Sequence, residues 1–183
     1  WKTEDAQKFA VLLQKFYRET KCREFFRSNQ EMFRIAEKRF TEIQKKVNFA
    51  WFRDFYGERP NGEFHLVVSL LNGNSNYNST VSLPNGTEDF FAIIGTSKTD
   101  QAGLPVFDET QSLPLIIHEF GHSFNNRLIY ANAKKLEKSG ELIFPQLSDE
   151  MRRQGYNSAL TMFIEAFLRA CVIKYLEKNP LQS

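Results

Sequence analysis

Apolar residues repeat with a helical period along the first quarter of the chain. Between residues 3 and 47 they recur three and four positions apart, around Phe9 and Phe16 and again around Phe33 and Phe40. This spacing places them on one face of an α-helix. The two runs predict a helical hairpin over residues 1–47.

The pattern changes to that of β-strands between residues 63 and 95. Residues 64–71 read FHLVVSLL, a short run rich in apolar and β-branched side chains that is typical of a strand. Two further apolar runs, 81–83 and 89–94, flank the pair Asn85-Gly86. Because Asn-Gly favours the backbone angles of a tight reversal, these runs predict a β-hairpin within a small sheet.

Helical periodicity returns in the last third of the chain. Residues 112–130 read as one helix, with Ser112 as its cap, and residues 157–178 read as another. We therefore expect the C-terminal helices over residues 112–178. The order of helices, strands and helices predicts an α+β fold, with a small mixed or antiparallel sheet, in one domain spanning 1–183.

Composition supports one globular domain and excludes several function classes. The 183 residues, 42% of them hydrophobic, suffice for one core, and eighteen Phe predict that this core is rich in aromatic rings. A net charge of +2 argues against a nucleic-acid surface. No apolar run approaches the length of a membrane-spanning helix. Cys22 and Cys171 are either free thiols or a disulfide, and the pattern indicates no oligomeric state.

Residues 118–122 read His-Glu-Phe-Gly-His and carry the strongest chemical signal. On a helix, His118 and His122 lie one turn apart on one face, where both imidazoles reach a single zinc ion. Glu119 then lies beside the metal and takes the proton of a zinc-bound water. The alternative is two helix histidines that are satisfied by hydrogen bonds.

Zinc in a catalytic site needs a third protein ligand. The metzincin pattern is excluded, because it requires Gly and His where this chain has Asn125 and Leu128. His65, the third histidine, falls in the predicted strand, where a satisfied core position explains it as well as metal binding does. Four acidic residues lie in charged or loop-like segments where solvation explains them: Glu137, Glu141, Asp149 and Glu150.

Glu165 differs from the other acidic residues, because it is the one charge between residues 159 and 168. A carboxylate in apolar surroundings needs a partner. Arg169, four positions later, supplies an ordinary helix pair, and zinc supplies a functional partner. The two are compatible, since Arg169 can orient a zinc ligand. Glu165 is therefore the expected third ligand.

With these motifs the chain resembles the gluzincins, HExxH peptidases whose third ligand is a glutamate on a later helix. Within that group it is similar to a bacterial zincin-like family catalogued as a domain of unknown function. The resemblance covers about residues 48–174 and rests on segments 51–57, 118–126 and 165–170. It implies a zincin-like fold, Glu165 as the third ligand, and a periplasmic or extracellular location.

The resemblance also suggests a group that stabilises the oxyanion. Gluzincins of the thermolysin kind often use a tyrosine or histidine for this role, and Tyr156 stands shortly before the Glu165 helix. Tyr77, Tyr130 and Tyr175 are alternatives, since a tyrosine with a satisfied hydroxyl is common.

The sequence thus predicts a zinc-dependent peptidase that hydrolyses peptide bonds with a zinc-bound water activated by Glu119. An edge strand near residues 77–83 is expected to pair with the extended backbone of a peptide or protein substrate. The alternative is a zincin-fold domain that binds or scaffolds a partner without turnover.

Overall fold

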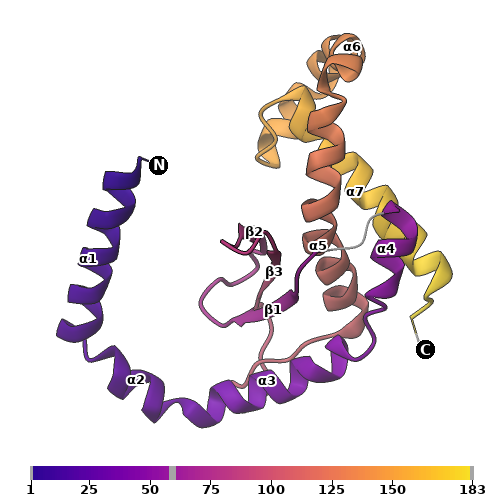
Figure 1. Cartoon of the computed structure of the whole chain (residues 1–183). Helices are drawn as coiled ribbons and strands as arrows, with labels where there is room; N and C mark the ends of the chain where they lie inside the picture. Colours follow the sequence, from indigo (N-terminus) through magenta and orange to yellow (C-terminus); the bar gives the residue numbers. More distant parts are fainter. Residues whose placement is uncertain (1, 58–60, 182–183) are drawn as a thin grey trace.

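The structure, a computed structural model, describes residues 2–57 and 61–181. Within them the chain forms seven helices and a three-stranded sheet, which confirms the α+β class (Figure 1). The helices are α1 (Thr3–Glu19), α2 (Cys22–Ser28), α3 (Gln30–Gln44), α4 (Ala50–Tyr56), α5 (Glu109–Ala131), α6 (Ala133–Arg153) and α7 (Ala159–Lys178). The strands are β1 (Phe64–Ser69), β2 (Tyr77–Ser82) and β3 (Glu88–Gly95).

The sheet is mixed and has the order β1-β3-β2. The predicted hairpin is confirmed, because β2 and β3 pair antiparallel around a turn in which Gly86 adopts a φ of 81°. A positive φ is a conformation that glycine adopts without steric cost. β1 pairs with β3 in parallel, which leaves β2 at an edge of the sheet.

Aromatic side chains fill the space between the sheet and α5, as the high Phe content predicts. Phe52 of α4 and Phe120 of α5 are fully buried, and Phe90 of β3 is 2% exposed. The ring of Phe52 stacks on that of Phe124, with centroids 5.7 Å apart. This core fixes one side of α5 against the sheet, while α7 packs along another side of the same helix.

The predicted N-terminal helical hairpin is wrong. Residues 3–44 form three successive helices, and Figure 1 shows α1 leading away from the sheet rather than back along α3. The helical conformation is interrupted at Lys21, whose φ of 53° is left-handed, and the short helix α2 follows. α3 buries Ala36, Phe40 and Ile43, whereas α1 buries none of its residues. Periodicity identified the apolar faces but not what each one packs against.

Two further expectations about the C-terminal helices need correction. α5 begins at Glu109, and its cap is Asp108, whose carboxylate accepts from the backbone N–H of Thr110, rather than Ser112. The acidic residues between 137 and 150 lie on α6 and not in loops, although their side chains are solvated as expected. α7 begins at Ala159 with Ser158 as its cap, close to the predicted start.

Cys22 and Cys171 are both free, so the disulfide alternative does not hold. Among the described residues, no helix is both long enough and apolar enough to cross a membrane.

Candidate metal centre

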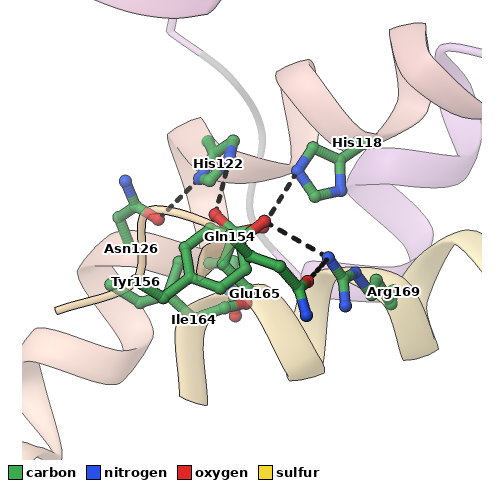
Figure 2. A network of polar contacts seen from close by, with 9 residues as sticks. His118, His122, Asn126, Gln154, Tyr156, Ile164, Glu165 and Arg169 are labelled. Atoms are coloured by element: carbon green, nitrogen blue, oxygen red, sulfur yellow. Dashed lines mark hydrogen bonds and ion pairs between the residues drawn. The ribbon is translucent and has the colours of Figure 1, made fainter. Parts of the chain in front are cut away.

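Helices α5 and α7 bring three potential metal ligands together. Nε2 of His118 lies 3.4 Å from Oε2 of Glu165, and Nε2 of His122 lies 3.6 Å from Oε1 of the same carboxylate. Figure 2 shows both imidazoles on α5 directed at the carboxylate on α7. In the described part of the chain, these three residues form the group of His, Cys, Asp and Glu side chains able to hold a metal ion.

The distances between the ligand atoms of the three residues are compatible with a metal ion bound among them. Tetrahedral ligands bonded at about 2.1 Å lie roughly 3.4 Å from one another. The ligand atoms of the three residues all lie within 4.8 Å of one another, and the two measured N to O separations are close to the tetrahedral value. Both separations exceed an ordinary N–H···O hydrogen bond. The three predicted ligands are therefore close enough together to hold one metal ion.

A second contact orients His122. Its Nδ1 lies 3.1 Å from Oδ1 of Asn126, one helical turn further along α5. Because an amide oxygen only accepts, Nδ1 of a neutral His122 donates its proton there, which leaves the Nε2 lone pair available to a metal ion. Burial lowers the pKa of His122, which favours the neutral form that a metal ligand needs. The sequence assigned no role to Asn126, although its spacing of four residues from His122 is a signal that it shares this face.

Two small features on α5 hold the helices together at this point. A Cβ on Gly121 would lie 2.8 Å from Cδ2 of Leu168, so glycine permits the close approach of α7. The buried Asn125 donates from Nδ2 to the backbone oxygen of Ile164, the residue before Glu165. These two contacts position Glu165 opposite the histidines, and neither contact was predicted from the sequence pattern.

Glu119 lies on α5 and, together with His118 and Glu165, lines a cleft between α5 and α7. Its side chain is 7% exposed, and burial raises its pKa to about 7. The Glu165 carboxylate adds to this rise, while His118 opposes it. A carboxyl group with such a pKa is suited to accept and to return a proton near neutral pH.

The predicted helix pair between Glu165 and Arg169 does not form. Among the described residues, Glu165 pairs with the two histidines, while Arg169 donates to Oη of Tyr156 at 3.2 Å and to Oε1 of Gln154 at 3.4 Å (Figure 2). Burial alone would raise the pKa of the Glu165 carboxyl, but His118, His122 and a hydrogen bond with Tyr156 together outweigh burial and lower that pKa. These neighbours favour the carboxylate form of Glu165.

Tyr156 lies close to the metal group formed by His118, His122 and Glu165. It lines the cleft together with His118 and Glu165, and its pKa is raised chiefly by burial and also by the Glu165 carboxylate. Tyr175 is instead fully buried, and its hydroxyl accepts from the backbone N–H of Asn48 at 2.7 Å. Tyr77 lies on β2, and Tyr130 is exposed near the end of α5.

His65 is not part of this group. It lies on β1, where Nε2 is 3.5 Å from Oδ2 of Asp89 and the ring stacks on Phe91 with centroids 4.6 Å apart. The acidic residues of α6 are exposed. Neither alternative source of a third ligand therefore joins the two histidines of α5.

Comparison with known proteins identifies the family of the chain. Its sequence matches the family described as "Domain of unknown function (DUF4932)" over residues 2–179. The chain belongs to this family, in agreement with the resemblance to a family catalogued under unknown function. No curated protein and no solved structure matches the chain.

Proposed function

We propose that the protein is a zinc-dependent peptidase. The observation that supports this most strongly is the convergence of His118, His122 and Glu165 beside the buried carboxyl of Glu119. Two imidazoles and one carboxylate are a donor set of catalytic zinc sites, in which the fourth position stays open. Bound zinc would supply a Lewis acid that polarises a carbonyl group and acidifies water.

Glu119 is the proposed general base. Its carboxylate accepts the proton of the attacking water and passes it to the departing amine, a double role that suits a group with a pKa of about 7. Tyr156 supplies an O–H donor at the edge of the cleft, where it would stabilise negative charge that develops on the substrate oxygen.

The edge strand β2 is the proposed binding site for substrate backbone. Its residues are mostly exposed, and Thr80 donates to Oγ of Ser123, the residue after His122, at 3.1 Å. An extended peptide that pairs with an exposed edge strand gains main-chain hydrogen bonds without dependence on its side chains. The substrate in this proposal is therefore a peptide or protein. The periplasmic or extracellular location that we propose with it rests on the family resemblance alone.

Changing Glu119 to Gln tests this proposal. The amide cannot accept a proton, so we expect Glu119→Gln to keep zinc and the fold while hydrolysis of a diverse peptide library falls by about a hundredfold or more. Glu109→Gln, on the first turn of the same helix, is the matched control and should hydrolyse peptides like the unaltered protein. Activity of Glu119→Gln near that of the unaltered protein would contradict the assignment. A library left uncleaved by the zinc-loaded unaltered protein would favour a binding or scaffolding domain.

A further inference from the structure

The cleft beside the metal group continues well beyond the three ligands. It has a volume of about 460 Å³ and runs between α5 and α7. From His118 it extends toward the start of α5, past Leu115, Pro114 and Gln111, and from Glu165 toward the end of α7, past Arg169, Val172 and Ile173. The wall is thus apolar on both helices, with one cation set into it close to the metal group.

Arg169 carries a charge that no carboxylate neutralises in the described part of the structure. Its two hydrogen bonds, both from Nη2, go to the uncharged oxygens of Tyr156 and Gln154. Other arginines of the chain do meet carboxylates, as Arg39 meets Asp100 at 2.7 Å and Arg127 meets Glu88 at 2.6 Å. A guanidinium has five N–H donors in a planar fork. In the described structure only Nη2 of Arg169, which lines the cleft, makes hydrogen bonds, so the other donors remain available to a ligand.

The side chain is also held in place before any ligand arrives. Gln154 and Tyr156, from the turn between α6 and α7, both contact its Nη2, and its Cζ lies 5.8 Å from the centroid of the Tyr156 ring. A guanidinium fixed by such contacts loses less conformational entropy when it binds an anion than a free surface arginine does. Its planar fork matches the two oxygens of a carboxylate.

We propose that Arg169 binds a carboxylate of the substrate. The apolar wall of the cleft next to Arg169 then contacts apolar side chains of the substrate that adjoin this carboxylate. This inference rests on the proposed peptidase function and names the substrate class of the same site. The carboxylate is either the C-terminal group of a peptide or the side chain of an Asp or Glu. Both sources present the same pair of oxygens to the guanidinium.

Peptide binding to the zinc-loaded Glu119→Gln protein tests the inference without any need for turnover. Calorimetry compares three acetylated hexapeptides: one with a free C-terminus, one with a C-terminal amide, and an amidated one with a Glu in place of a Gln. We expect a carboxylate-bearing peptide to bind about tenfold to a hundredfold more tightly than the uncharged one. The peptide that binds more tightly shows whether the bound carboxylate is the C-terminal group or the Glu side chain.

Arg169→Gln separates the arginine from the metal, since zinc also attracts carboxylates. Added to the Glu119→Gln protein, it should remove most of the preference for the charged peptide, while Arg169→Lys should restore part of it. Arg152→Gln, an exposed arginine on α6, is the matched control and should leave the preference unchanged. Equal thermal stability and zinc content establish that each variant is folded.

A preference that survives Arg169→Gln, or equal binding of all three peptides, would overturn the inference. Hydrolysis without any carboxylate preference would leave the peptidase standing and remove the role of Arg169. Selective binding that depends on Arg169, in a protein that hydrolyses none of the peptides, would support the carboxylate site and count against the peptidase. In an active enzyme, Arg169→Gln should raise KM for the charged substrate with little change in kcat.

Discussion

The two carboxylate oxygens of Glu165 each lie close to one imidazole of the metal group. His118 approaches one oxygen and His122 the other, at 3.4 and 3.6 Å. The sequence located this residue because a lone charge in an apolar stretch requires a partner. Of the two partners considered for Glu165, the ion pair with Arg169 does not form, because Arg169 turns to Tyr156 and Gln154. Nothing in a local sequence pattern reveals that contact with the preceding turn.

Changing Glu165 to Gln should therefore weaken metal binding far more than changing Arg169 to Ala. The amide lacks the charge that attracts a cation, and we expect zinc affinity to fall by more than about a hundredfold. The loss should be this large because removal of a residue that only hydrogen-bonds to a metal ligand already costs roughly tenfold to a hundredfold. Arg169→Ala serves as the control, because in the described structure the hydrogen bonds of Arg169 go to Tyr156 and Gln154 and not to any of the three ligands. Competition with a zinc indicator measures both variants. Equal losses would make Glu165 a structural partner of the histidines rather than a ligand.

At the scale of elements, the site depends on how closely α5 and α7 approach. The helices α5 and α7 and the β2-β3 hairpin were recognisable from the sequence, because Asn-Gly and apolar periods are local signals. The parallel pairing of β1 with β3 and the helix α6 were not. Parallel pairing joins strands that are not consecutive in the chain, and the sequence of α6 is mostly polar.

Gly121→Ala tests the contact between these helices. At an exposed helical position this change stabilises a protein by roughly 0.5–1 kcal/mol. Here the added methyl group would lie 2.8 Å from Leu168, which is fully buried, so we expect a loss of about 1–3 kcal/mol instead. Zinc retention should weaken as well, because α7 carries Glu165. Urea unfolding of the metal-free protein measures the change in the free energy of unfolding. A gain in stability would show that α5 and α7 are not in close contact at Gly121.

On the scale of the whole molecule, α1 differs from the rest of the chain in how little of it is packed against other elements. α1 buries no residue, and the neighbour with which it shares most contacts is α2 (Figure 1). Several of its apolar side chains are more than half exposed, among them Val11, Leu12 and Phe16. Composition and periodicity indicate a helix here, but the burial of its apolar face depends on contacts that the local sequence does not encode.

Removing residues 1–20 should consequently leave the core and the metal centre intact. We expect the melting temperature to fall by less than about 2–4 °C, the shift that roughly 1 kcal/mol produces in a protein of this size. Zinc content should not change, since the ligands lie on α5 and α7. Differential scanning calorimetry and elemental analysis of the shortened protein measure the two quantities. A large loss of either would mean that α1 packs on the core.

The central claim is that His118, His122 and Glu165 hold a catalytic zinc ion, and the zinc content of the purified protein tests it most directly. Elemental analysis should find about one zinc per chain, because these three ligands form one open site. The same measurement on the variant with His118→Ala and His122→Ala should find almost none, while circular dichroism shows that its helices persist. Zinc that stays at about one per chain in this variant would contradict the account.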